Sequence, residues 1–351
     1  MSVTLDALWR RAVRRGLIAS GLETAHLLAR IGLMRQARGR GAIFTLHHVR
    51  PQQISPIAPN AHLEITPEFL DQAILQLAAD GYDFIPLDAL PARLAMNTAR
   101  PFACFTLDDG YRNNVDFALP VFERHGVPCT IFVSEGFAER RATLWWETVA
   151  LLLSRVDSLR FDFGAGEEQV SVACPKRKLD AFDRFSMFVQ AGDETCAVAS
   201  IDALASGHGI DAMAITSALT MDSAELARIS THPLISLGAH TPSHRALGRL
   251  TEEVARREMV SSTEWLEQLT GQRPRTLAYP YGTRWAVTER EPKIARELGY
   301  TVAVTTQPGT ICDSSIHELT ALPRISLNGY YQTPRYVTAL ASGIPFAMSA
   351  A

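Results

Sequence analysis

Apolar runs of strand length alternate with amphipathic helical patterns along most of the chain, and this alternation restricts the fold more than any other feature. Strands and helices that alternate at this spacing predict a parallel α/β sheet or barrel. The expected strands are 42–49, 82–85, 102–107, 128–133, 235–239, 277–281, 301–305 and 322–327. The expected helices are 66–79, 87–94, 115–125, 252–270 and 292–298.

The expected strand 102–107 ends in two adjacent carboxylates, Asp108 and Asp109, followed by Gly110. Acids at the end of a buried strand cost free energy unless they accept hydrogen bonds, pair with a cation or bind a metal. Because adjacent carboxylates repel each other, a metal ion is a natural way to hold both near one site. The alternative is an Asp-Gly turn or a helix N-cap after the strand.

Two further strand ends carry residues of similar chemistry. His240 and His244 follow strand 235–239, and Tyr281 ends strand 277–281. The carboxyl ends of parallel strands meet on one face of a barrel, so these side chains are expected to lie together. A carboxylate and two imidazoles are a common ligand set for a divalent cation. His-x-x-x-His alone is a weak signal, but together with the Asp-Asp-Gly strand end it predicts a metal site.

Size and composition restrict the class of protein. The chain has 351 residues, 47% of them hydrophobic, which suits one barrel with insertions or two ordinary domains. A net charge of −3 gives no general case for nucleic-acid binding. The five cysteines are scattered without a Cys-x-x-Cys pair, which argues against a disulfide framework or a thiolate metal site. A reducing, cytoplasmic location fits this cysteine usage.

Residues 1–40 form a basic segment, with eight arginines against Asp6 and Glu23. Polar residues interrupt the apolar run 17–33, so neither a membrane-spanning helix nor a secretory signal is expected. A basic helical arm remains, and it has two interpretations. It makes peripheral contact with the anionic inner face of a membrane, or it packs against the domain or stays a solvated tail.

The alternation of strands and helices stops between 140 and 218, where Trp145 and Trp146 precede helical patterns and one weak hairpin signal. We interpret this segment as a mostly helical insertion that either shapes the mouth of the site or is a structural appendage. The expected division is a 1–40 basic helical arm, a barrel domain of 41–139 and 219–335, a 140–218 helical insertion and a 336–351 C-terminal tail.

Three segments resemble, in order, the motifs of polysaccharide deacetylases, the NodB-homology domains of carbohydrate esterase family four. They are Phe-Thr-Leu-Asp-Asp-Gly-Tyr (105–111), His-Thr-Pro-Ser-His (240–244) and Tyr-Pro-Tyr-Gly (279–282). The resemblance covers residues 42–139 and 219–327 and implies an α/β fold, a distorted, incomplete (β/α) barrel. It also implies metal-dependent hydrolysis of an N-acetyl or O-acetyl group.

By this resemblance Asp109, His240 and His244 bind a divalent metal, commonly Zn²⁺, and Asp108 is the general base. A divalent ion polarises a carbonyl and lowers the pKa of bound water, and a neighbouring carboxylate can remove a proton as that water attacks. The backbone N–H of Tyr281 is a candidate donor to the oxyanion. The side chains of Tyr111 and Tyr281 either line the sugar site or are packed aromatics.

The chain also departs from the family pattern. Ala278 stands where the family often has an arginine that partners the catalytic Asp. Arg324, on the last strand, is our candidate for a catalytic replacement, with a structural ion pair as the alternative. The Leu-x-x-His motif that supplies a general acid is not recognisable, and neither is the Asp-x-x-Asp-Trp motif. His47 and His48 end the first strand, and one of them faces the pocket or supports it from behind; we take His48 as the substrate-binding candidate.

We therefore expect a metal-dependent deacetylase that acts on an N-acetylated sugar of a polysaccharide, an oligosaccharide or a lipid-linked glycan. The basic arm would suit a glycolipid substrate. Two alternatives stay open. One is a hydrolase of the same fold that acts on a non-sugar amide, against which the complete set of metal residues counts. The other is a catalytically inactive glycan-binding module, which the missing acid and Ala278 keep open.

Overall fold

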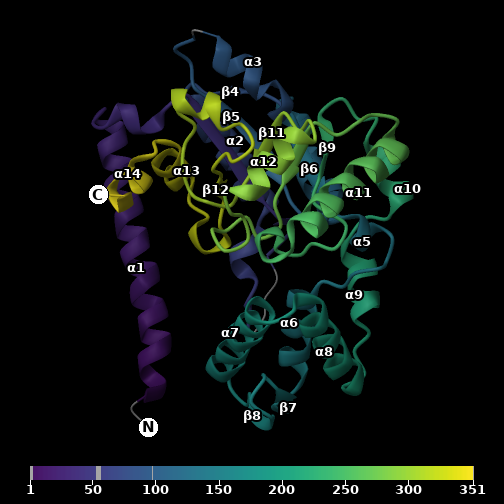
Figure 1. Ribbon diagram of the computed structural model, residues 1–351. Helices are drawn as coiled ribbons and strands as arrows, with labels where there is room; N and C mark the ends of the chain where they lie inside the picture. Colours follow the sequence, from purple (N-terminus) through teal and green to yellow (C-terminus); the bar gives the residue numbers. More distant parts are fainter. Residues whose placement is uncertain (1–2, 53–56, 97, 351) are drawn as a thin grey trace.

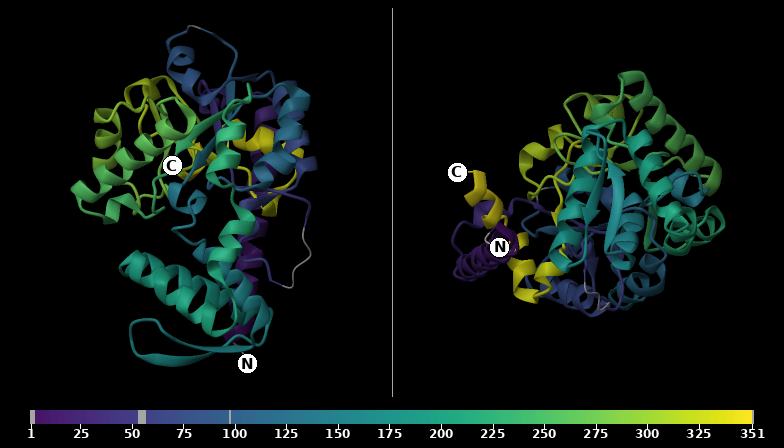
Figure 2. Two further views of the ribbon diagram at one scale, coloured as in Figure 1. Left: turned by 90° about the vertical axis from the view of Figure 1, so that its right-hand side faces the viewer. Right: turned by 90° about the horizontal axis from the view of Figure 1, so that it is seen from below.

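The computed structural model describes residues 3–52, 57–96 and 98–350, with a curled parallel sheet at its centre and helices around it (Figures 1 and 2). The strand order is β11-β10-β9-β6-β5-β1-β12, and β4 pairs with the first half of β5. The strands are β1 Gly41–Leu46, β4 Asp83–Phe84, β5 Phe102–Leu107, β6 Cys129–Val133, β9 Ile235–Ala239, β10 Thr276–Ala278, β11 Val302–Val304 and β12 Ile325–Ser326.

The sheet curls far enough for its last strand to return to its first. Leu322 bridges to Val304 of β11, and three residues later Ile325 of β12 pairs with Phe44 of β1. Residues 322–325 therefore contact both β11 and β1, although no full strand closes the gap between these two strands. This confirms the expected α/β fold, a distorted and incomplete (β/α) barrel.

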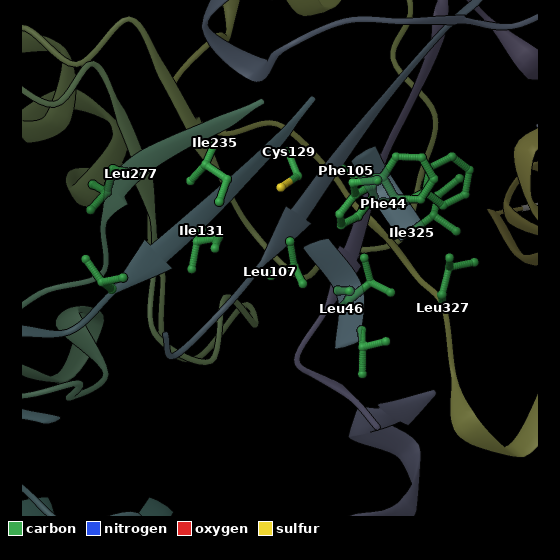
Figure 3. Packing of buried hydrophobic residues seen from close by; sticks show 14 of the residues in the cluster. Phe44, Leu46, Phe105, Leu107, Cys129, Ile131, Ile235, Leu277, Ile325 and Leu327 are labelled. Atoms are coloured by element: carbon green, nitrogen blue, oxygen red, sulfur yellow. The ribbon is translucent and has the colours of Figure 1, made fainter. Parts of the chain in front are cut away.

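Both faces of the central strands are covered, which explains their unbroken apolar sequence. All six residues of β1 and all six of β5 are buried. Phe44, Leu46, Phe105 and Leu107 belong to the cluster shared with the outer helices (Figure 3). Their neighbours in the sequence, such as Ile43, point into the barrel.

Helices α2 Pro67–Ala79, α4 Leu119–His125, α10 Ser223–Ile229, α11 Glu252–Thr270 and α12 Arg290–Glu297 cover the outer face of the sheet. Helix α3, Leu90–Ala95, packs Leu90 and Leu94 into the cluster inside the barrel, and the short helix α5, Glu135–Ala138, follows β6 at the strand ends. The expected helix 115–125 is divided: a π-helical turn, Asn114–Ala118, precedes α4. Pro120 has no N–H with which to continue an α-helical ladder through this point.

Short elements complete the barrel domain. Strand β2, His48–Val49, pairs with β3, Glu64–Ile65. The 3₁₀ turns are η1 Arg35–Arg38, η2 Ala61–Leu63, η3 Leu87–Ala89, η5 Leu247–Arg249, η6 Asp313–His317 and η7 Gly329–Tyr331.

The segment between α5 and α10 folds into a unit of its own beneath the barrel (Figure 1). Its elements are α6 Trp145–Arg155, β7 Ser158–Asp162, β8 Glu167–Ser171, α7 Pro175–Ala191, α8 Glu194–Gly207 and α9 Ala212–Leu219. It has a separate hydrophobic core that includes Leu152, Phe185 and Ile201, and this core continues into the barrel through Tyr111 and Phe137. The insertion therefore packs directly against the barrel and is not joined to it by the connecting chain alone.

Helix α1, Val3–Arg30, runs down one side of the molecule and extends past the barrel (Figure 1). Leu22 and Ala25 are buried against α13, Pro334–Ala341, and α14, Ile344–Ala350. Helix α13 begins at Pro334, so it runs across the expected boundary at 335/336. Residues 1, 2 and 351 of the expected arm and tail lie outside the described residues. Within the described residues, no helix combines the length and the hydropathy needed to span a bilayer.

Candidate active site

Three parallel strands end at the same edge of the sheet, and each is followed by one of the expected polar segments. Asp108 and Asp109 follow β5, His240 follows β9, and Tyr281 follows β10. Strand β6 lies between β5 and β9, so the acids and the histidine approach each other across one intervening strand. Parallel topology therefore assembles in space what lies more than 130 residues apart in the chain.

Asp109, His240 and His244 form a buried cluster. Asp109 Oδ1 lies 3.4 Å from His240 Nε2 and 3.2 Å from His244 Nε2, and one ligand atom from each residue falls within 4.8 Å of the others. His240 Nδ1 donates to the Ala278 carbonyl at 2.7 Å, which leaves Nε2 with a free lone pair. Asp109 Oδ1 is buried without a hydrogen-bond donor. A buried acceptor and two imidazole lone pairs that converge on one point fit a divalent cation.

The loop that carries both histidines is held firmly. The Pro242 carbonyl accepts hydrogen bonds from the Gly136 N–H and the Ser134 hydroxyl, and a Cβ on Gly136 would lie 2.3 Å from that oxygen. The Ser243 N–H and hydroxyl both donate to Glu258 on α11. Pro242 thus lies in a tight loop rather than in a helix, and this loop brings both rings to Asp109.

Asp108 makes a two-pronged ion pair with Arg324. The two guanidinium nitrogens donate to Oδ1 at 2.7 Å and to Oδ2 at 2.6 Å, and Arg324 Nε donates to the Thr305 carbonyl. Both side chains are buried, with Arg324 only 1% exposed. Burial raises the pKa of Asp108, but the guanidinium outweighs it and the pKa lies below its usual value. Arg324 therefore supplies the cationic partner that Ala278 cannot provide, and Asp108 stays ionised at neutral pH.

His47 and His48 take different positions. His47 follows the end of β1, faces the cavity and lies 4.0 Å from Asp108 Oδ2. His48 is fully buried behind the cavity, where its Nδ1 contacts Asn113 at 2.7 Å and its ring stacks on Tyr111. We expected His48 to contact the substrate, but its side chain does not line the cavity. Its side chain is enclosed because β2 begins at this residue.

The two expected tyrosines also separate. Tyr111 is fully buried behind the site, and its hydroxyl accepts a hydrogen bond from Trp146 Nε1 at 2.9 Å, so it is a packed aromatic. Tyr281 lines the cavity. Its hydroxyl accepts from Trp145 Nε1 at 3.1 Å and donates to Glu194 at 2.5 Å. Tyr281 therefore joins the barrel to both α6 and α8 of the insertion.

A cavity of about 400 Å³ opens over these groups. Asp108, Asp109, His240 and His244 lie at its floor, and the insertion supplies its wall. The wall residues that the sequence did not assign to the site are Trp145, Trp146, Phe182, Ser186 and Gln190. The adjacent tryptophans are the sequence signal for this wall, because large aromatic side chains with an N–H group commonly line sites that are partly polar.

The backbone is strained around the cluster. Among the described residues, six that are not glycine have a positive φ, and four of them are Asp109 (70°), Thr241 (60°), His244 (53°) and Tyr281 (61°). Such conformations cost roughly 1–3 kcal/mol each and persist only where the surrounding structure fixes them. Their concentration at one place singles out this edge of the sheet as the candidate site.

We expect Tyr281→Phe to lower the free energy of unfolding by about 1–3 kcal/mol, because the Trp145 indole N–H and a Glu194 oxygen both lose their partner. Urea unfolding followed by tryptophan fluorescence measures this loss. Tyr331→Phe is the matched control, since the hydroxyl of Tyr331 bonds to no described residue. Equal stability of the two variants would contradict the role of Tyr281 in joining the insertion to the barrel.

The fold and the site together place a candidate metal-binding cluster at the strand ends of a (β/α) barrel. Residues 191–303, which include His240, His244 and Tyr281, match the family model described as polysaccharide deacetylase. Over this part of the chain the sequence is similar to the polysaccharide deacetylase family. The match agrees with the expected resemblance and with the expected class of enzyme, a hydrolase of carbon–nitrogen bonds.

Solved structures show the same fold at low sequence identity. The Streptococcus pyogenes deacetylase PplD in complex with acetate is 18% identical, with 82% of this chain and 92% of that chain covered and a TM-score of 0.54. IcaB from Ammonifex degensii is 16% identical, with 88% and 98% covered and a TM-score of 0.53. A polysaccharide deacetylase from Bacillus cereus is 17% identical, with 86% and 68% covered and a TM-score of 0.52. No curated protein sequence matches the chain significantly.

Proposed function

We propose that this chain is a metal-dependent deacetylase that hydrolyses the acetamido group of an N-acetylated sugar. The observation that carries the proposal is the ionised Asp108, clamped by Arg324 and directly adjacent to the Asp109, His240 and His244 cluster at the floor of one cavity. Tryptophan and phenylalanine side chains on the cavity wall suit the apolar faces of a sugar ring.

Asp109, His240 and His244 would hold the metal, and their mixed carboxylate and imidazole donors suit Zn²⁺. When bound, such an ion supplies Lewis-acid activation of a carbonyl and of water. Hydrogen bonds hold both imidazoles in position, because the Ala278 carbonyl accepts from His240 Nδ1 and the Ser134 hydroxyl donates to the Pro242 carbonyl in the loop that carries His244.

The residues of the chain can complete the hydrolysis with a balanced transfer of protons. Asp108 takes a proton from the water whose oxygen attacks the acetyl carbonyl carbon, and the oxyanion that forms can accept a hydrogen bond from the Tyr281 N–H. Within the described residues, that N–H donates to no other group. The carbon–nitrogen bond then breaks, and the sugar amine leaves with a proton while acetate remains.

His47 is the residue best placed to deliver that last proton. It faces the cavity from the end of β1, with its Nε2 4.0 Å from Asp108. Burial lowers the pKa of His47, so the imidazole rests neutral and must receive a proton during the reaction. Asp108, once protonated by the attacking water, can supply it, and His47 would pass it to the amine.

Acetate release from N-acetylated oligosaccharides by variants of these two residues tests the proposal. Asp108→Asn and His47→Gln are each expected to lower kcat by roughly 10²–10⁴-fold, because each removes one proton transfer. The exposed residues Asp116 and His317 provide the matched controls Asp116→Asn and His317→Gln, with unchanged rates. Full activity of Asp108→Asn would refute the base assignment, and full activity of His47→Gln would refute the acid assignment alone.

A further inference from the structure

Exposed apolar side chains gather on the N-terminal arm. Of the thirteen large hydrophobic side chains exposed among the described residues, seven lie between residues 13 and 34. They are Val13, Leu17, Ile18, Leu27, Ile31, Leu33 and Met34, which are 36% to 68% exposed. Soluble domains seldom collect so many on one short segment unless the surface binds something.

The spacing of these residues produces a stripe along one face of α1. Val13, Leu17 and Leu27 fall on the same side of a 3.6-residue helix, and the small residues Ser20 and Thr24 lie between them. Ile31 continues this side one residue beyond the end of α1, where its N–H donates to the Leu27 carbonyl. The opposite side of α1 holds Leu22 and Ala25, which pack against α13 and α14. The helix is therefore fixed to the barrel by one face and exposes an apolar stripe on the other.

A cationic cavity lies where α1 ends. It has a volume of about 320 Å³ and is lined by Arg30, Arg35 and Arg38 together with Leu33 and Met34. None of the three arginines forms an ion pair with a described residue, and Arg38 Nε is buried without a hydrogen-bond partner. The one acid on the wall, Asp80, already accepts hydrogen bonds from Gln76 and Thr338. Unpaired guanidinium groups in a concave site match a phosphate group.

We infer that the arm docks on an anionic phospholipid bilayer, with a lipid phosphate in the arginine cavity and the apolar stripe in the acyl boundary. Arginines beside exposed leucines are the composition of helices that lie in the membrane interface. The charge on this surface also favours a lipid bilayer over a second copy of the chain as the binding partner. A second copy of the chain would bring these unpaired arginines close to their own equivalents, whereas anionic headgroups neutralise them.

The docked arm would lie next to the mouth of the active-site cavity. The Arg15 guanidinium lies 3.7 Å from the centroid of the Tyr330 ring, and that ring lies 6.4 Å from the ring of His62. His62 lines the active-site cavity. If the proposed deacetylase function holds, this placement favours a glycan carried on a membrane lipid as the substrate. The docking itself does not depend on that function.

Sedimentation of the full-length protein with vesicles tests the docking. We expect binding to vesicles that contain phosphatidylglycerol, no binding to vesicles of phosphatidylcholine alone, and weaker binding as the salt concentration rises. Arg35→Gln and Arg38→Gln should each weaken partitioning about fivefold, and Leu27→Gln at least about tenfold. Arg257→Gln on α11 and Leu75→Gln on α2 are matched controls that change exposed residues elsewhere and should leave partitioning unchanged.

Other outcomes would overturn the proposal. Equal binding to both kinds of vesicle, or none to either, would contradict recognition of anionic lipid. A rise in Tm with inorganic phosphate that Arg38→Gln abolishes, without vesicle binding, would assign the cavity to a free anion. A dimer in light scattering that Leu27→Gln dissociates, again without vesicle binding, would assign the stripe to a second copy. Acetate release from soluble oligosaccharides, measured in parallel, separates failure of docking from failure of the deacetylase proposal.

Discussion

Arg324→Met is expected to lower the free energy of unfolding by about 3–5 kcal/mol, because it leaves the Asp108 carboxylate buried without its cation. Asp108 is 3% exposed, so water in the cavity replaces the two lost hydrogen bonds only in part. Part of the loss is expected to appear as protonation of Asp108, since burial alone raises the pKa of that carboxyl. The variant should therefore lose both stability and the ionised base.

Urea unfolding of Arg324→Met, Asp108→Asn and the double variant forms a cycle that isolates the pair. The double variant should be more stable than the sum of the single losses predicts, with a coupling of about 0.5–3 kcal/mol. Arg257→Met is the matched control, because its ion pair with Glu253 is exposed and should contribute less than about 1 kcal/mol. Arg324→Lys keeps the charge without the two-pronged geometry, so it should retain part of the stability and lose activity. Additive losses in the cycle would contradict the pairing.

The second large effect is expected at the metal cluster. Zn²⁺ at one hundred times its Kd should raise the free energy of unfolding of the wild-type protein by about 2.7 kcal/mol. His240→Ala removes one of three ligands and should weaken metal binding by more than the roughly 10–100-fold that loss of a supporting partner costs. The Asp109 oxygen that lacks a donor explains why the gain should be large, since the ion would provide its missing partner.

Metal content after dialysis and the Tm with and without Zn²⁺ measure this effect. His317→Ala is the matched control, since His317 is exposed at η6 and lies outside the cluster. If the His240→Ala variant gained as much stability from Zn²⁺ as the wild-type protein, the metal would have to bind elsewhere. A wild-type chain that neither retains nor responds to a divalent metal would remove the cluster from the mechanism.

The barrel, and the sheet edge that carries the polar side chains of the site, could be predicted from the sequence because the sequence patterns that indicate them are local. A strand buried on both faces must be an unbroken apolar run, and the residue after it must lie at the sheet edge, so the positions of Asp108, His240 and Tyr281 followed from the order of the chain alone. The sequence signals for the ends of helices are equally local. Thr251, for example, accepts a hydrogen bond from the Val254 N–H at the start of α11.

Other features depend on contacts that no local pattern contains. Arg324 and Asp108 are 216 positions apart, and only the return of the last strand to β1 brings them together. The positions of His47 and His48 depend on a break between β1 and β2. This break interrupts the regular alternation of side chains, which would otherwise predict the side of the strand on which each histidine lies. Trp145 and Trp146 are part of the site because the insertion packs over the strand ends. The sequence left open whether the insertion shapes the mouth of the site or is a structural appendage.

The central claim is that the cluster and Asp108 together hydrolyse an N-acetylated sugar. The most direct test is acetate release from N-acetylated oligosaccharides by purified protein of known metal content, before and after chelation and after return of the metal. Our account predicts release by the metal-loaded protein, loss on chelation and recovery on reloading. Stoichiometric metal without acetate release from any N-acetylated glycan, or release that chelation leaves unchanged, would contradict it.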